Sequence, residues 1–148
     1  MIDSSLKVKL HTHGWLILFN SLIAMMIASR YFTFLPELPS DSLGIFFIFS
    51  STFSQMSLLA GIAGLVTLPL IFLPTALRRF LQSGTAALGI SILIIDTFVF
   101  AQYRFHINAV VLDLILSGQI VSFPWLTWLI VVIGVSALWV GEWLIIRR

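Results

Sequence analysis

The chain has 148 residues, of which 59% are hydrophobic and 9% are charged, and its formal net charge is +2. Globular proteins carry about 25% charged residues, so this composition indicates an integral membrane protein with no separate water-soluble domain. The absence of cysteine excludes disulfides, thiolate metal sites and thiol catalysis, and no basic tract with interleaved aromatic residues suggests nucleic-acid binding.

The first apolar segment covers about residues 14–35 and follows a polar leader that carries Lys7 and Lys9. It is longer than the roughly 7–15 residues of a secretory signal core, and further apolar segments follow it, so we expect a retained signal anchor. The loop 36–41 holds two prolines and two acids, which end the helix.

The leader also contains the pair His11 and His13. Two imidazoles with no acid or cysteine beside them make a weak metal site, so we expect solvated residues here. Nothing in the chain resembles a nucleophile with its base, a phosphate-binding glycine loop or a metal-binding helix pair. The sequence therefore predicts no enzyme activity, no metal site and no cofactor.

The second apolar segment, about 43–73, exceeds the ~20 residues that a helix needs to cross the bilayer, so it should be tilted or kinked, with the kink at Pro69. After a short turn over 74–79, a third span is expected at about 80–102. Small residues recur at helical spacing in both spans and predict close helix packing. They are Ser50, Ser54, Ser57, Gly61 and Gly64 in the second span, and Ser83, Ala87 and Ser91 in the third.

Residues 107–117 follow helical spacing but are too few to cross a bilayer, so they predict a short interfacial helix. The last span is expected at about 124–146, with Trp125, Trp128, Trp139 and Trp143 as aromatic belts. The predicted fold is thus an all-α four-transmembrane-helix bundle, residues 1–148 being a single membrane domain.

Charge asymmetry predicts the orientation of this bundle. With four spans, six of the eight basic residues lie on one side, at the N-terminus, at Arg78 and Arg79, and at Arg147 and Arg148. Four of the six acids lie near the other side. The positive-inside rule then places both termini in the cytoplasm and the interfacial helix outside.

Asp96 is the most suggestive single residue, because a carboxylate in a span usually has a partner or a function. It lies about 24 Å along the third span, at a depth comparable to that of Arg30 on the antiparallel first span. We expect an ion pair between Arg30 and Asp96 that ties two helices together. A proton relay would need further acids deep in the bundle, and the sequence has none.

Arg104, His106 and Asn108 form an outer polar cluster with Asp96. They could recognise an anionic lipid headgroup through the arginine and the histidine. The alternative is interfacial anchoring and helix capping, because strong anionic-lipid sites usually hold about 4–8 basic residues. Both readings remain open from the sequence.

Several short motifs resemble the N-terminal membrane domain of the YejM/PbgA inner-membrane proteins of Gram-negative bacteria. They are Gly14-Trp15, Leu18-Phe19-Asn20, Ser29-Arg30-Tyr31, Phe80-Leu81, and Ile95-Asp96 followed by Val99-Phe100, Tyr103, His106 and Asn108. The resemblance covers about residues 14–146. Family members have five spans and a periplasmic alkaline phosphatase- or sulfatase-like domain, whereas this chain resembles their first four helices.

The resemblance implies a multi-pass domain of the bacterial inner membrane whose interfacial helix lies on the periplasmic side. It also implies a non-catalytic part in a regulator of lipopolysaccharide and cardiolipin balance. The implied partners are membrane lipids, cardiolipin or lipopolysaccharide among them, and a membrane-anchored adaptor of a regulated protease. Two alternatives are the anchor of a phosphoethanolamine transferase- or sulfatase-type enzyme and, ranked last, a small transporter subunit.

Overall fold

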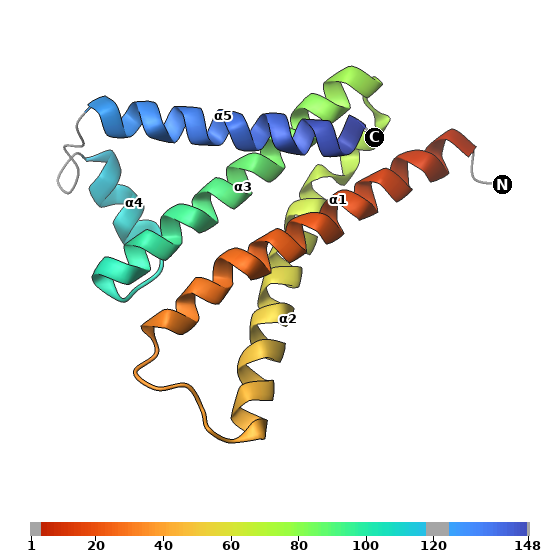
Figure 1. The fold of residues 1–148 in the computed structure, drawn as a ribbon. Helices are drawn as coiled ribbons and strands as arrows, with labels where there is room; N and C mark the ends of the chain where they lie inside the picture. Colours follow the sequence, from red (N-terminus) through yellow and green to blue (C-terminus); the bar gives the residue numbers. More distant parts are fainter. Residues whose placement is uncertain (1–3, 118–124, 148) are drawn as a thin grey trace.

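The fold is that of a computed structural model, which describes residues 4–117 and 125–147. Within these ranges the chain forms helices and no strand (Figure 1). The elements are α1 (Ser4–Ala28), η1 (Ser29–Phe34), α2 (Ser42–Thr67), η2 (Leu68–Phe72), α3 (Thr75–Tyr103), α4 (Ala109–Leu116) and α5 (Trp125–Arg147). In the part of the chain that the structure describes, four stretches are long and apolar enough to cross a membrane: Ser5–Phe34, Ser42–Phe72, Thr75–Tyr103 and Leu129–Ile146. The predicted all-α membrane bundle is confirmed.

The polar leader is helical, although the sequence suggested a solvated leader before a span at about residue 14. Helix α1 begins at Ser4, and side chains four residues apart bond along it. The hydroxyl of Thr12 donates to the carbonyl of Val8 at 2.9 Å, and Trp15 Nε1 donates to His11 Nε2 at 3.1 Å. No proline interrupts this stretch, so the helix continues straight into the apolar segment.

Proline residues shape both ends of the connection between α2 and α3. Pro69 cannot donate a backbone hydrogen bond, so α2 ends at Thr67 and tightens into the 3-10 helix η2, where the sequence predicted a kink. Helix α3 then starts at Thr75, directly after Pro74. Arg78 and Arg79 therefore belong to the beginning of α3 rather than to the expected turn over 74–79.

Side-chain caps begin two other helices. Asp41 precedes α2 and its carboxylate accepts a hydrogen bond of 2.8 Å from the backbone N–H of Gly44. Asn108 precedes α4, which covers Ala109–Leu116 within the interfacial helix predicted at 107–117. The predicted last span started at residue 124, and the segment 118–124 lies outside the described residues.

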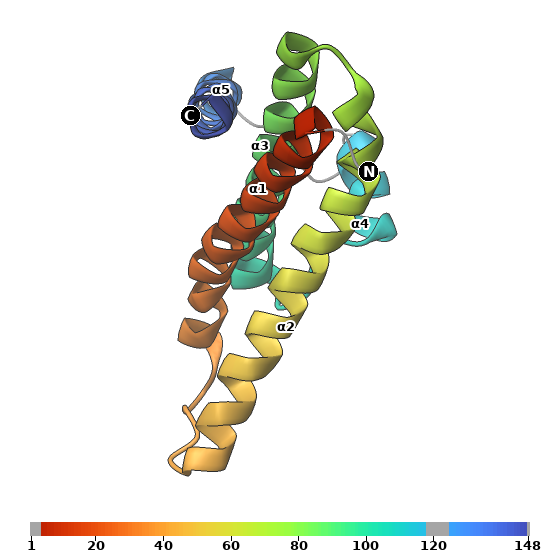
Figure 2. The ribbon, with the colours of Figure 1, turned by 90° about the vertical axis from the view of Figure 1, so that its right-hand side faces the viewer.

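The helices pack as two pairs joined through α1 and α3. Helix α1 packs mainly on α2, α3 packs mainly on α5, and α1 also contacts α3. In Figure 2, α1 and α3 lie between α5 on one side and α2 on the other. A small core of Ala24, Ala28, Met56 and Ile90 holds α1, α2 and α3 together, whereas many large apolar side chains are exposed. An apolar exterior is what a lipid environment favours.

The small residues that the sequence predicted in α3 are buried, and one of them, Ser83, contacts α5. Ser83, Ala87 and Ser91 are buried, and Trp139 of α5 donates hydrogen bonds to Ser83 Oγ at 3.0 Å and to the carbonyl of Phe80 at 3.2 Å. A Cβ atom at Gly84 would lie 3.0 Å from the indole ring of Trp139. Trp139, which the sequence places in an aromatic belt, packs on α3.

Candidate functional site: the groove between α1, α2 and α3

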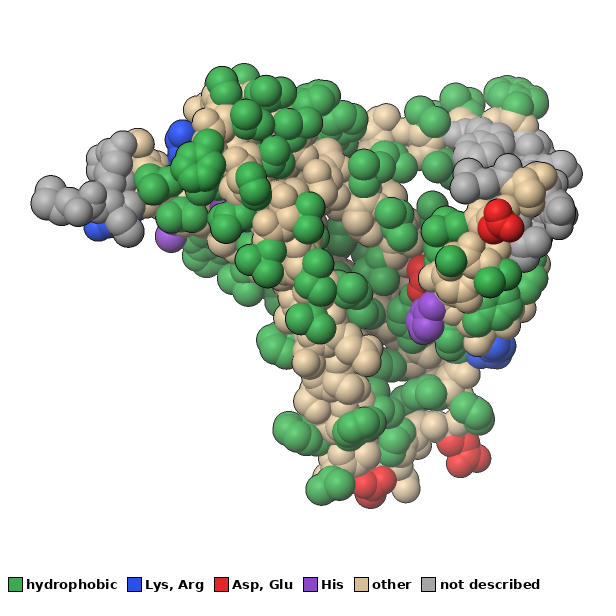
Figure 3. All heavy atoms as spheres, turned by 180° about the vertical axis from the view of Figure 1, so that it is seen from behind, with side chains coloured by type: hydrophobic (Ala, Val, Ile, Leu, Met, Phe, Trp, Pro, Cys, Tyr) green, Lys and Arg blue, Asp and Glu red, His purple; other side chains and the backbone are tan. Residues whose placement is uncertain are grey.

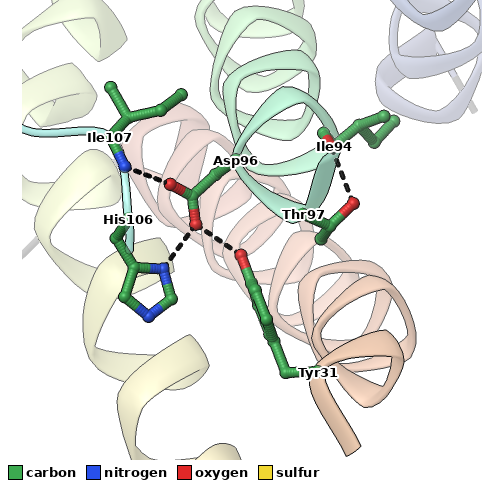
Figure 4. Close-up of polar contacts among 6 residues, drawn as sticks. All are labelled: Tyr31, Ile94, Asp96, Thr97, His106 and Ile107. Carbon is green, nitrogen blue, oxygen red and sulfur yellow. Dashed lines mark hydrogen bonds and ion pairs between the residues drawn. The ribbon is translucent and has the colours of Figure 1, made fainter. Parts of the chain in front are cut away.

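Asp96 is the centre of a hydrogen-bonded cluster at the end of α3 (Figure 4). Its Oδ2 accepts a hydrogen bond of 2.5 Å from the hydroxyl of Tyr31 and one of 2.7 Å from Nδ1 of His106. Its Oδ1 accepts a hydrogen bond of 2.6 Å from the backbone N–H of Ile107. Only 13% of the Asp96 side chain is exposed. One carboxylate therefore joins η1, α3 and the loop that follows α3.

The backbone brings these groups together at two places. After Ala28 the first helix tightens into η1, which carries Tyr31. At the end of α3, Arg104 adopts the left-handed conformation with φ of 61°, and the chain turns back so that His106 reaches Asp96. The guanidinium of Arg104 fixes this turn by donating a hydrogen bond of 3.0 Å to the carbonyl of Phe34.

Aromatic rings surround the cluster. The ring of Tyr31 lies edge-on to those of Phe100 and His106, each with a centroid distance of 5.2 Å, and the rings of Phe100 and His106 are 4.8 Å apart. Such edge-to-face packing restricts the tyrosine and imidazole rings. It therefore supports the orientation in which both side chains donate to Asp96.

The predicted ion pair between Arg30 and Asp96 is not formed. Arg30 Nη1 donates to Thr97 Oγ1 at 3.3 Å, and the guanidinium lies 4.1 Å from the ring centroid of Phe98. Successive residues on a helix point about 100° apart, so Arg30 meets Thr97 while its neighbour Tyr31 meets Asp96. Among the described residues, the ion pair that Asp96 makes is with His106.

The three predicted headgroup residues all make bonds within the chain. Arg104 holds Phe34, His106 binds Asp96, and the side-chain oxygen of Asn108 accepts hydrogen bonds from the N–H groups of Val110 and Val111 at 3.0 and 3.1 Å. Asn108 is thus the capping residue that one of the two readings expected. His106 keeps 63% of its side chain exposed and can still meet a second group.

A second polar cluster lies near the beginning of α3, and the sequence did not predict it. His13, expected to be solvated, is 4% exposed and lies between Gly64 of α2 and Gln82 of α3. Its Nε2 is 3.0 Å from the carbonyl oxygen of Gly64, which can only accept, so this nitrogen carries the proton. Nδ1 then accepts a hydrogen bond of 2.9 Å from Nε2 of Gln82.

An apolar groove with a volume of about 580 Å³ connects the two clusters. His13 and Gln82 line one end of it, and Asp96 and His106 line the other. Between them the walls are mostly small or apolar side chains of three helices, with Asn20, Thr67 and Thr85 as the polar exceptions. The apolar lining includes Leu16, Ile17 and Ala24 of α1, Met56, Ala60 and Ala63 of α2, and Ala86, Gly89, Ile90 and Leu93 of α3. Figure 3 shows this face hollowed and covered mainly by hydrophobic side chains.

A further polar contact joins α1 to α5. Asn20 Nδ2 donates to Glu142 Oε2 at 3.2 Å and to the carbonyl of Leu16 at 3.0 Å. Asn20 thus bonds α1 to a neighbouring helix. Glu142 is only 4% exposed.

The chemistry of the groove is that of a binding surface. The described residues contain no group of three or more His, Asp or Glu side chains that could hold a metal ion. At each end the polar groups are hydrogen-bonded within their own cluster, and the walls between the ends offer mainly van der Waals contacts. The groove can therefore hold an apolar ligand, with hydrogen-bonding groups at its two ends.

Comparison with known proteins places this architecture in a family. Residues 2–148 match the family model described as "Domain of unknown function (DUF3413)". The chain is 33% identical over 106 residues to the "Inner membrane protein YejM" of Salmonella typhimurium, and the match to the protein of the same name in Salmonella typhi has the same identity. Each match covers 70% of this chain and 18% of the relative. The chain therefore belongs to the DUF3413 family, that of the N-terminal membrane domain of YejM.

Proposed function

We propose that this chain is a non-catalytic inner-membrane domain that takes part in a YejM-like control of the envelope lipids lipopolysaccharide and cardiolipin. It detects lipid by holding one acyl chain in the groove between α1, α2 and α3. The observation that carries this proposal is the groove itself, an apolar channel of about 580 Å³ between three membrane-length helices.

The size and lining of the groove favour an acyl chain over a polar solute. Ligand sites usually have volumes of roughly 300–1,000 Å³, so this groove has room for a ligand. The walls are mainly aliphatic, and from Gln82 to Asp96 the groove extends about 21 Å along α3. One leaflet is about half of the ~30 Å hydrocarbon layer, so an extended chain from either leaflet fits within this length.

The Asp96 cluster couples the groove to the loop after α3. Asp96, His106 and Ile107 line one end of the groove and are bonded to one another. An acyl chain that reaches this end contacts the residues that hold the loop in place. His106, with most of its ring exposed, and Arg104 are then available to a lipid headgroup. Binding or loss of the acyl chain thereby changes the loop after α3, which forms the surface that a protein partner, such as a membrane-anchored adaptor, would bind.

The test fills the groove without disturbing the bundle. Gly89 lines the groove, and a Cβ atom at this position would meet nothing within 4 Å. Gly89→Leu should therefore fold and occupy the space of the ligand. Gly134→Leu is the matched control, because Gly134 is also exposed in a helix and open to 4 Å but lies on α5, away from the groove.

The measurement is the number of lipids that stay bound to the detergent-extracted protein, determined by native mass spectrometry. We expect Gly89→Leu to lose one bound lipid that the original chain and Gly134→Leu both retain. Equal lipid retention in all three proteins would contradict the proposal.

A further inference from the structure

At the beginning of α3, Arg78 is a buried cation that has no partner among the residues the structure describes. Its side chain is 6% exposed, and its Nε atom has no hydrogen-bond partner. Across residues 4–117 and 125–147, no acid forms an ion pair with it, and Glu142 of the adjacent α5 is bonded to Asn20 instead. A buried charge that lacks a partner is costly, so membrane proteins nearly always pair such groups.

Arg79 repeats this pattern beside it. This residue is half-buried, and its Nε atom is also without a hydrogen-bond partner. Two adjacent guanidinium groups repel each other when no anion lies between them. Long side chains of a helix generally lean toward its N-terminus, which for Arg78 and Arg79 is the first turn of α3.

The first turn of α3 offers further donors in the same place. Pro74 precedes the helix and has no side chain that can cap it, and the first turn contains no acid. The N–H of Arg78 bonds to the carbonyl of Pro74, which leaves the N–H groups before it without helical partners. Free N–H groups and the helix dipole together favour an anion, and phosphate groups are among the anions that bind at helix N-termini.

The position of Arg78 relates this site to the membrane. Arg78, Gln82, Gly89 and Asp96 lie on one face of α3, and Arg78 and Asp96 are about 27 Å apart along the axis. This length is close to the ~30 Å thickness of the hydrocarbon layer, so the arginines lie at the headgroup level. A second apolar groove of about 270 Å³ lies between α3 and α5 and is lined by Phe80, which follows Arg79 in the sequence, and by Trp139 and Trp143.

We propose that Arg78, Arg79 and the first turn of α3 bind the phosphate group of an anionic phospholipid in the leaflet where α3 begins. The guanidinium groups supply paired donors that match phosphate oxygens, and the helix N-terminus supplies backbone donors. The apolar groove at Phe80 favours a lipid as the source of the phosphate. This site lies at the opposite end of α3 from Asp96 and does not depend on an acyl chain in the larger groove.

The test compares charge changes at matched positions in the full chain. The double variant Arg78→Gln/Arg79→Gln removes two positive charges from the proposed site. The control Lys7→Gln/Lys9→Gln removes two positive charges from α1, where both side chains are more exposed than Arg78. Each protein is placed in nanodiscs of phosphatidylglycerol and phosphatidylcholine, and the retained lipids are counted by native mass spectrometry.

We expect the original chain and the lysine variant to retain phosphatidylglycerol in preference to phosphatidylcholine. The double arginine variant should lose this preference, by roughly fivefold for each arginine. Arg78→Lys/Arg79→Lys keeps the charge but not the planar fork, and should retain an intermediate preference. An unchanged preference in the glutamine variant, or an equal loss in the lysine control, would overturn the proposal.

Two further measurements keep the test decisive. If Arg78→Gln prevents folding, the single variants Arg79→Gln and Arg78→Lys replace it in the lipid measurement, since both preserve a buried cation at residue 78. Inorganic phosphate added in excess should not displace phosphatidylglycerol, and displacement would assign the site to a soluble phosphate. Gly89→Leu should leave the headgroup preference intact, so failure of the groove and failure of the phosphate site can be told apart.

Discussion

Tyr31 and Asp96, 65 residues apart in the sequence, are joined by a hydrogen bond of 2.5 Å from the tyrosine hydroxyl to the carboxylate. This bond links the end of the first span to α3. Because the same carboxylate also binds His106 and the N–H of Ile107, three segments depend on one side chain. The cluster is therefore the main polar connection at this end of the groove.

Removing either partner of this bond should destabilise the bundle. Tyr31→Phe and Asp96→Asn should each lower the thermal stability in detergent, with a loss of about 1–3 kcal/mol where a buried polar group is left unpaired. In the double variant the losses should not add, and the coupling should be roughly 0.5–3 kcal/mol. Thermal unfolding of the two single variants and the double variant measures this coupling.

Arg30→Gln provides the comparison, because Arg30 bonds to Thr97 rather than to Asp96. Combined with Asp96→Asn, it should show a smaller coupling than Tyr31→Phe does. If the coupling energy between Arg30 and Asp96 exceeded that between Tyr31 and Asp96, the assignment of Tyr31 as the partner of Asp96 would be wrong.

The buried bond between Gln82 and His13 should contribute strongly to the packing of α1 on α3. Gln82→Leu leaves Nδ1 of the buried His13 without its donor, and should cost about 1–3 kcal/mol of stability. Gln102→Leu makes the same chemical change at an exposed position of the same helix and should have little effect. Thermal unfolding of the two variants measures the difference. If both variants lost the same stability, the bond between Gln82 and His13 would contribute nothing specific.

The close approach of α1 and α2 depends on the missing side chain of Gly64. A Cβ atom there would collide with Cδ1 and Cγ1 of Ile17, whereas a Cβ atom at Gly61 would meet nothing within 4 Å. Gly64→Ala should therefore lower the melting temperature, and Gly61→Ala should leave it unchanged or raise it slightly because alanine favours helix. Ile17→Val, which removes Cδ1, should partly restore Gly64→Ala, and a lack of any rescue would refute this explanation.

Composition and periodicity predicted the four membrane-length helices because apolar length is a direct requirement of the bilayer. The kink at Pro69 and the packing row of Ser83, Ala87 and Ser91 were also predictable, since each follows from a local property of the residues. The row from Ser50 to Gly64 was only partly correct. Gly64 contacts Ile17, but Gly61 faces open space, because α1 crosses α2 near one end.

The side-chain pairs were harder to predict because they depend on rotation of one helix against another. Counting residues along the spans correctly placed Arg30 and Asp96 at a similar depth. The side chain that bonds to Asp96 is nevertheless that of the next residue, Tyr31, and Arg30 bonds to Thr97. The burial of His13 was missed because its leader looked polar. Gln82 could have indicated this burial, since a polar amide within an apolar helix needs a hydrogen-bond partner on a neighbouring helix.

The orientation of the bundle can be tested directly, because the chain has no cysteine. The positive-inside rule predicts that the loop before α2 faces the periplasm and that the N-terminus faces the cytoplasm. Ser40→Cys should react with a membrane-impermeant maleimide in intact cells, and Ser5→Cys should react only after permeabilisation. The reverse pattern would invert the topology.

Photochemical labelling by a lipid with a diazirine at the end of its acyl chain tests the binding groove most directly. After illumination in membranes, mass spectrometry of the peptides should find labels at groove residues such as Ala63, Ala86 and Gly89, in preference to the exposed face of α5 around Ile133. Gly89→Leu should remove the groove labels and leave the others. Labels spread evenly over all apolar faces, and unchanged by Gly89→Leu, would contradict the proposal that this domain holds a lipid chain between α1, α2 and α3.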